Sequence, residues 1–203
     1  MIELPSNIRF VPSYPQLVVP VSQTKYGNRA ISTVEFADPY RIVDMETLPM
    51  KASEAVQLQV FIAAARGGMG TIIYRPTHIC IPRAYWGDAN NSHLSGSPSR
   101  GTVTNGYTVQ LTGVVPGLQL MAGDLFSLKS GDYRQMLQVV TGATAVSTTL
   151  TVTVDQPIAS YIAPGATVRL KQPEMNTRLI KDSFQMGKGP RPVASFQLIE
   201  VPK

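Results

Sequence analysis

The sequence predicts a mainly β protein of the α+β class, in which a β-sandwich with one flanking helix carries an inserted small β-barrel domain. Only one stretch of the 203 residues, Lys51–Gly70, has a clear helical pattern. The rest consists of short apolar runs separated by turn residues, and the chain contains 16 glycines and 16 prolines. The composition changes near Pro82 and changes back after residue 174, which indicates that one unit is inserted into another.

Residues 1–50 contain apolar runs broken by prolines, and we expect three or four strands there. Proline cannot donate a hydrogen bond to a neighbouring strand, so some of these strands should lie at sheet edges or bulges. A turn around Gly27 and Asn28 separates two of the runs. The runs are Leu17–Val19, Ile31–Phe36 and Ile42–Val43.

A helix is predicted at about residues 51–66. One apolar face follows the spacing i, i+3, i+4 and i+7, and we expect it to lie in the core. Glu54 near the start suits the positive end of the helix dipole, and Gly67 with Gly68 should end the helix. Ser53 is a candidate N-cap, although Val56 excludes a full capping box there. The predicted core face is Leu58, Phe61, Ile62 and Ala65.

The same helix has a second apolar face. Val56, Val60 and Ala63 are spaced i, i+4 and i+7, which leaves only a thin polar edge on the helix. A helix that is apolar on two sides is usually covered on both sides. The protein's own sheet should cover one side, and Val56, Val60 and Ala63 are therefore candidate subunit-interface residues.

Four further strands should complete the first sheet. Two follow the helix, at Thr71–Pro76 and Thr77–Ile81, and two come from the end of the chain, at Asn176–Gln185 and Val193–Val201. Residues 1–83 plus 175–203 are therefore predicted to form one β domain with a helix. Residues 84–174 are predicted to form the inserted all-β, barrel-like domain.

The inserted unit begins with a polar loop up to Arg100 and then shows hairpin patterns. Asn105-Gly106 separates two apolar runs, the strongest short signal for a two-residue hairpin. Ser130–Asp132 separates Leu125–Lys129 from Tyr133–Val140, and residues 148–154 alternate between apolar and threonine side chains. Together with a run at 166–171, these strands suggest a small barrel or sandwich.

Charge and composition argue against several classes of function. The net charge is +5, and the basic residues are scattered, the nearest to a cluster being Arg178, Lys181, Lys188 and Arg191. A dedicated nucleic-acid binder concentrates such residues on one face, so we expect none. No apolar run reaches the roughly 20 residues of a membrane span, and the N-terminus has no signal-peptide pattern. The single cysteine, Cys80, excludes an internal disulfide framework and favours folding in a reducing cytoplasm.

We expect no catalytic, cofactor-binding or metal-binding residues. His78 and Cys80 would face the same way on a strand and could seed a metal site with His93, but a structural zinc site needs four ligands. Ordinary packing is favoured for both residues. Gly67–Gly70 follows a helix instead of opening one, so it does not match a phosphate loop. Asp124 and Asp132 follow glycines and are interpreted as turn residues, and no nucleophilic triad is evident.

Several stretches resemble one family. Val115–Leu128 looks like the "aGD-f-l" stretch of tail proteins from long-tailed bacteriophages, and Tyr133–Val140 looks like the strand that follows it there. Thr149–Val152 with Pro157, and then Pro164–Val168, are similar to that family's next two strands. Val43–Gly70 also resembles the family. The Pro-rich first 50 residues depart from it.

The resemblance implies a distal tail protein, the adaptor between the tail tube and the tip or baseplate. In that family the first domain forms a six-membered ring and the barrel-like domain projects outward. It implies a homo-oligomer that contacts tail tube and tip or hub proteins, has no catalytic residues, and resides in the virion after synthesis in the host cytoplasm. The alternative is a carbohydrate- or nucleic-acid-binding β-barrel module, for which Tyr107, Phe126 and Tyr133 are too scattered to form a binding face.

Overall fold

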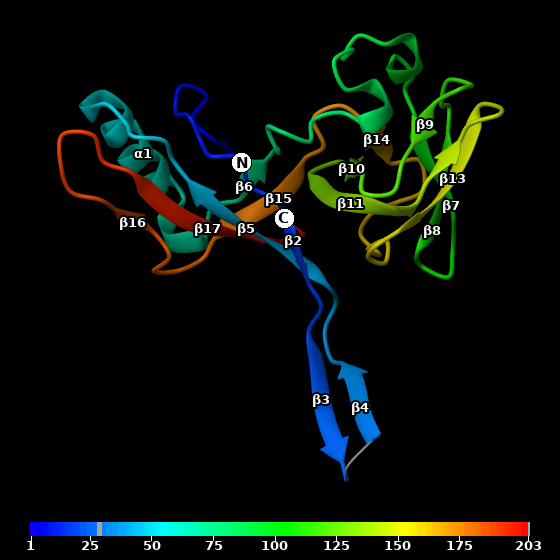
Figure 1. The fold of residues 1–203 in the computed structure, drawn as a ribbon, viewed down its shortest axis with the longest axis horizontal. Coiled ribbons are helices and arrows are strands. Elements are labelled where there is room, and N and C mark those ends of the chain that lie inside the picture. The colour runs from blue at the N-terminus through cyan, green and yellow to red at the C-terminus, as the bar shows by residue number, and fades with distance from the viewer. Residues whose placement is uncertain (28–29, 203) are drawn as a thin grey trace.

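The computed structural model describes residues 1–27 and 30–202, except for the side chain of Ala30. This part of the chain contains one α-helix and several β-sheets, which confirms the predicted mainly β class. Figure 1 shows two lobes side by side and a long hairpin that projects away from the region between them. None of the described helices combines the length and apolarity needed to cross a membrane.

The first lobe contains a seven-stranded sheet built from both ends of the chain. The prediction that the last strands return to this sheet is confirmed, because β15 and β17 pair with each other and with strands from the first third of the sequence. The order is β1 (Ile2–Glu3), β6 (Ile72–Tyr74), β15 (Met175–Leu179), β17 (Ala194–Glu200), β5 (Tyr40–Glu46) and β2 (Gln16–Val18), with β16 (Gln185–Met186) beside β17.

The helix α1 (Ala52–Ala64) packs against this sheet. Its N-cap is Lys51, whose backbone N–H donates a hydrogen bond to Glu54 Oε2 at 2.6 Å. The helix therefore starts earlier than a Ser53 cap would allow, with Glu54 closing its first turn. The helix ends at Ala64 with Ala65 as its C-cap, and Gly67 (φ 62°) and Gly68 (φ 97°) lie in a short 3₁₀ turn, Arg66–Gly68, that follows it, so the predicted glycine C-cap is wrong.

The second lobe contains six strands whose pairings close into a cycle, as in a small barrel. Its core is a cluster of buried aliphatic side chains with Phe126. A short pair, β9 (Gln119–Leu120) with β12 (Ala143–Thr144), lies beside it. The cycle runs β10 (Leu125–Ser130), β11 (Tyr133–Thr141), β13 (Thr149–Val154), β8 (Thr108–Thr112), β7 (Ser99–Thr104), β14 (Thr167–Arg169) and back to β10.

The predicted hairpins of this lobe are confirmed. Asn105 and Gly106 have the predicted positive φ values, 53° and 74°, between β7 and β8, but Thr104 pairs with Thr108, so the loop contains three residues (105–107) instead of two. Gly131 has a φ of 60° between β10 and β11. In β13 the side chains of Leu150, Val152 and Val154 are buried, as their alternation predicts.

The predicted strand at Thr77–Ile81 is wrong. The chain there is irregular and joins β6 to two short 3₁₀ turns, Arg83–Tyr85 and Ser92–Leu94. Pro76 and Pro82 flank the segment, and each lacks the N–H that a strand would donate to a neighbour. The apolar residues of this run reflect burial against both lobes, since Ile79 packs against the core cluster of the first and Ile81 belongs to that of the second.

Candidate assembly surface

The two faces of α1 have different surroundings. Leu58, Phe61 and Ala65 are buried and Ile62 is partly buried, and the Phe61 ring lies 6.2 Å from the Phe196 ring. The candidate interface residues lie on the opposite face and point away from this core: Val56, Val60 (64% exposed) and Ala63. Three neighbouring apolar side chains on one helix face are therefore uncovered in the single chain.

The projecting hairpin is the second exposed apolar feature, and we call it the arm. It consists of β3 (Val21–Tyr26) and β4 (Ala30–Glu35), and it continues directly from β2 and β5 of the sheet (Figure 1). The pairing of β2 with β5 does not run unbroken into that of β3 with β4, because Pro20 and Pro39 lie at the junction. One hydrogen bond, from the Phe36 N–H to the Pro20 carbonyl (3.1 Å), links the two chain segments at this junction.

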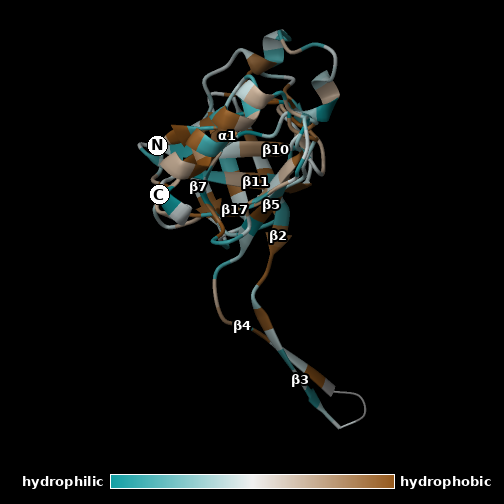
Figure 2. Ribbon diagram, turned by 90° about the vertical axis from the view of Figure 1, so that its left-hand side faces the viewer, coloured by the Kyte–Doolittle hydropathy of each residue, from teal (hydrophilic) through white to brown (hydrophobic). Residues whose placement is uncertain are grey.

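Both faces of the arm carry exposed apolar side chains. Because side chains alternate along a strand and Tyr26 pairs with Ala30, Tyr26, Val34 and Phe36 (70% exposed) share one face. Val21 and Ile31 lie on the other face. Figure 2 shows these apolar segments on a ribbon that stands clear of the rest of the molecule. A lone two-stranded hairpin is marginally stable in water, so this arm is suited to packing against a partner.

The turn of the arm was predicted around Gly27 and Asn28. Gly27 has a φ of 61°, which fits a tight turn, whereas Asn28 lies outside the described residues. The strand prediction for Ile31–Phe36 is confirmed by β4, but β4 pairs only with β3 and lies outside the core of the sheet.

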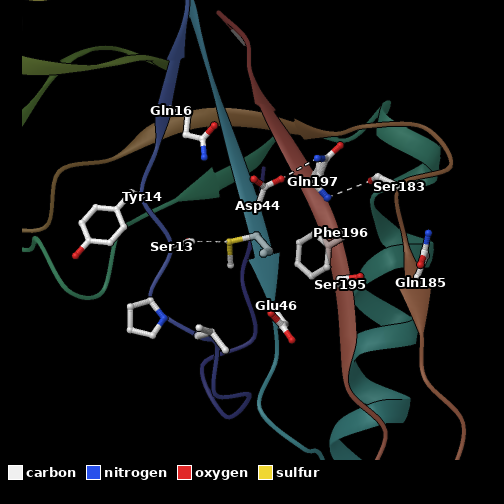
Figure 3. Close-up of a pocket in the computed structure, with 13 residues that line it drawn as sticks. Ser13, Tyr14, Gln16, Asp44, Glu46, Ser183, Gln185, Ser195, Phe196 and Gln197 are labelled. Atoms are coloured by element: carbon white, nitrogen blue, oxygen red, sulfur yellow. Dashed lines mark hydrogen bonds between the residues drawn. The ribbon is translucent and has the colours of Figure 1, made fainter.

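A groove of about 580 Å³ lies on the polar face of the sheet (Figure 3). Residues of β5 and β17 alternate between the core and this face, so Asp44, Glu46 and Gln197 point to solvent. Gln197 Nε2 donates to Asp44 Oδ1 at 2.7 Å, and Gln197 N–H donates to Ser183 Oγ at 3.1 Å. Since the described residues that line it include Asp44 and Glu46 and no lysine or arginine, the groove is an acidic surface on a chain of net positive charge.

Buried charges join the two lobes, and we call this region the seam. The Arg41 guanidinium of β5 is 1% exposed, pairs with Asp155 that follows β13, and donates from Nε to the Met136 carbonyl of β11 at 3.3 Å. The Arg41 backbone N–H donates to Glu200 Oε2 of β17 at 3.0 Å. Burial raises the pKa of Glu200 to about 7, and the nearby Asp155 charge adds to the rise.

Glu174 is the second buried carboxylate of the seam. It accepts hydrogen bonds from Arg134 Nε of β11 at 2.8 Å and from Arg75 Nη2 at 3.1 Å, and it pairs with Arg169 Nη1 at 2.8 Å. Burial alone would raise the pKa of Glu174, but the hydrogen bonds from Arg134 and Arg169 outweigh it and hold this pKa below its usual value. Glu174 therefore bridges the first sheet and two strands of the second lobe.

The histidine and cysteine candidates for metal binding have ordinary surroundings. His78 and Cys80 do not lie on a strand, so the expectation that they share a strand face is wrong. The His78 ring packs against Tyr14 at 4.1 Å, and burial lowers the pKa of its imidazole. His93 packs against Tyr85. Among the described residues, no group of three or more His, Cys, Asp or Glu side chains could hold a metal ion. Asp124 is buried and accepts from the Arg83 and Met121 backbone N–H groups, so it anchors a turn.

Sequence reasoning missed the seam, although a signal for it exists. Arg41 stands in register with Val43 and Met45, both of which face the core, and Glu200 stands in register with Phe196 and Leu198. A charged residue that continues the inward-facing register of a strand must find a partner inside the protein. The pattern identifies the residues, but it does not tell which residue is the partner.

Comparison with known proteins adds no relative, because no family model and no curated protein matches this chain.

Proposed function

We propose that this chain is a structural, non-enzymatic virion protein, a ring-forming subunit at the distal end of a phage tail that links the tail tube to the tip or baseplate. The observation that carries the proposal is the presence of two separate exposed apolar surfaces, the outer face of α1 and the arm (Figure 1). The resemblance of Val115–Leu128 and Val43–Gly70 to distal tail proteins supplies the family context.

Two different patches are what a closed ring requires. A head-to-tail contact joins one patch of a subunit to a different patch of the next, and it closes when the rotation is right. In the proposed ring the arm of one subunit covers Val56, Val60 and Ala63 of its neighbour. The first lobe, a sheet with one flanking helix, forms the ring, and the barrel-like lobe projects outward, with tube and hub proteins as further partners.

The test compares three variants with the wild type by light-scattering mass and circular dichroism. Val60→Glu places a charge on the outer helix face, and Phe36→Ser removes the most exposed apolar side chain at the arm. Gln57→Glu is the matched control, because it adds the same charge to an exposed polar position of α1. We expect the first two variants to fold normally and to remain monomeric at concentrations where wild type and control form a ring.

A mixture of Val60→Glu and Phe36→Ser subunits gives the sharpest result. Each variant keeps one intact patch, so a head-to-tail contact predicts dimers in the mixture and none in either variant alone. A mixture that stays monomeric argues against contact between arm and helix. A wild type that stays monomeric at its highest soluble concentration contradicts autonomous ring formation.

A further inference from the structure

A cavity of about 370 Å³ lies where the base of the arm, the barrel-like lobe and the C-terminal segment meet. Three chain segments and one side chain of β11 line it. The start of β5 and the two residues before it contribute Asp38–Tyr40, the loop after β13 contributes Gln156–Tyr161, the end of β17 and the residues after it contribute Glu200–Pro202, and β11 contributes Gln135. The cavity is separate from the groove of Figure 3 and from the outer face of α1.

The charged side chains that line this cavity among the described residues are acidic. In the part of the chain that the structure describes, its lining contains the carboxyl groups of Asp38 and Glu200 and no lysine or arginine. The nearest cation on its inner side, the guanidinium of Arg41, is already paired with Asp155. Glu200 and Asp38 are close enough to Tyr161 that, after burial, their charges help to raise the pKa of its phenol to about 12. The described lining therefore carries two carboxyl groups without a cation of its own.

One oxygen of the Glu200 carboxyl group lacks a hydrogen-bond partner among the described residues. Its Oε2 accepts the backbone N–H of Arg41, but Oε1 is shielded from solvent and has no hydrogen-bond partner within the described residues. A buried acceptor of this kind costs free energy until a donor reaches it. The unpartnered oxygen belongs to a residue that lines the cavity, so a ligand that brings N–H donors satisfies it.

The walls of the cavity suit an apolar stem. Tyr40 and Tyr161 contribute aromatic surface, and the Tyr161 ring lies 5.3 Å from that of Tyr133. Prolines and Ile158 provide the remaining apolar lining. An ammonium or guanidinium group gains from an aromatic face as well as from a carboxylate, and its methylene stem packs on such a wall.

We infer that this cavity is a binding site for an organic cation, an ammonium or guanidinium group carried on an apolar stem. Glu200 pairs with the charged head and Tyr161 packs against it, while Asp38 adds negative charge at the side of the arm. Such a cation exists as a free amine and as the arginine or lysine side chain of a second copy of this chain.

Proton linkage gives this site a distinctive signature. Because the pKa of the buried Glu200 is about 7, most of its carboxyl groups are neutral at pH 6 and ionised at pH 8. The cation pairs with the ionised form, so its affinity should rise roughly tenfold between these two pH values. The other charged or titratable groups around Glu200 are Arg41 on β5, Asp155 after β13, and Asp38, Tyr40 and Tyr161 in the cavity.

The experiment titrates the full chain with N-acetyl-arginine methylamide and follows backbone amide shifts by NMR. N-acetyl-citrulline methylamide, which has the same shape without the charge, is the control probe. Glu200→Gln preserves the size of the side chain, and Glu46→Gln removes a carboxylate from the separate groove as the matched control. We expect the arginine probe to shift amides at 156–161, and we expect Glu200→Gln to weaken its binding at least tenfold while retaining the wild-type circular dichroism spectrum.

The source of the cation is read from the oligomer mass. If the arginine probe disperses wild-type oligomers, a partner copy supplies the cation, and if the mass is unchanged, the site takes a free amine. Equal shifts with the citrulline probe would overturn the inference. Undiminished binding by Glu200→Gln, or an affinity that does not change between pH 6 and pH 8, would overturn it as well.

Discussion

The buried carboxyl group of Glu200 lies beside the Arg41–Asp155 pair of the seam, and its burial has a consequence for stability. Burial raises the pKa of Glu200 from 4.5 to about 7. Between these pH values the folded protein keeps a proton that the unfolded chain has released. The free energy of unfolding therefore falls as the pH rises through this range, by about 3 kcal/mol at most.

Urea denaturation of wild type and Glu200→Gln at pH 4.5, 6 and 8 measures this contribution. The variant has no titrating group at this position, so its stability should lack the decline. His78 and the other titrating groups affect both proteins alike and cancel in the difference. Parallel stability curves for the two proteins would show that Glu200 titrates normally.

Phe61 provides a prediction about the helix core. It is 5% exposed and packs against Phe196, and no cation lies in the described cluster around it. Phe61→Asp would bury an unpaired carboxylate at a cost of several kcal/mol, comparable to the whole stability of a domain. We expect loss of the folded circular dichroism spectrum, in contrast to Val60→Glu on the exposed face. A soluble variant with an unchanged melting temperature would contradict the burial of this face.

At the scale of elements, the arm is expected to contribute to assembly and little to folding. Val18 of β2 lies directly opposite Tyr40 of β5, so a two-residue Asn-Gly turn can close this pair in place of residues 19–39. Neither core cluster includes a described side chain from residues 19–39. We expect the shortened protein to keep its melting temperature within a few degrees and to lose ring formation. A large fall in the melting temperature would show that the arm stabilises the fold.

The elements differ in how well their sequences predicted them. The Asn105-Gly106 hairpin and the alternation of β13 were predictable because a turn with positive φ and a half-buried strand each impose a local pattern. The strands of the arm were predictable as strands. Their exposure was not, because β4 outside the core and β5 within it show the same alternation of apolar and polar residues. Apolar content alone led to a wrong strand at Thr77–Ile81, since only the tertiary contacts of Ile81 explain its hydrophobicity.

For the whole molecule, strands from both ends of the chain form the first sheet, and strands from 99–169 form the second lobe. The predicted units are 1–83 plus 175–203 and 84–174. That each of them folds independently stays a prediction. Met136 and Leu125 of the second lobe pack into the core of the first, so the units share apolar surface as well as charges. The sequence could not show this, because pairing across the seam joins residues as distant as Arg41 and Asp155.

Excision tests these boundaries. Replacing residues 84–174 with a Gly/Ser linker removes Asp155 and leaves the buried Arg41 unpaired, which should destabilise the remaining domain by several kcal/mol. Adding Arg41→Met removes that charge while keeping an apolar stem. We expect the protein with both changes to melt cooperatively. The protein with the excision alone should not melt cooperatively, or should melt at a clearly lower temperature. If neither protein melts cooperatively, the first unit does not fold without the second.

Glu174 holds the two lobes together more strongly than any exposed ion pair can. Its carboxylate is buried and lies beside three guanidinium groups, of which that of Arg134 is only 8% exposed. Glu174→Gln keeps the shape of the side chain but removes the negative charge that these three guanidinium groups share. Breaking a buried pair in this way costs about 3–5 kcal/mol. Glu3→Gln is the matched control, since Glu3 pairs with Arg75 at the surface, where a salt bridge contributes about 1 kcal/mol or less.

Urea denaturation of both variants, together with Arg134→Gln and the Glu174→Gln/Arg134→Gln double variant, completes the test. Since the two residues interact directly, the double variant should lose clearly less stability than the sum of the two single losses. The m-value carries further information, because it scales with the surface exposed on unfolding. If the lobes unfold as one unit, the m-value of Glu174→Gln equals that of the wild type. A lower m-value, with separate transitions for the two lobes, would show that Glu174 couples their unfolding, and additive losses would show that Arg134 does not pair with it.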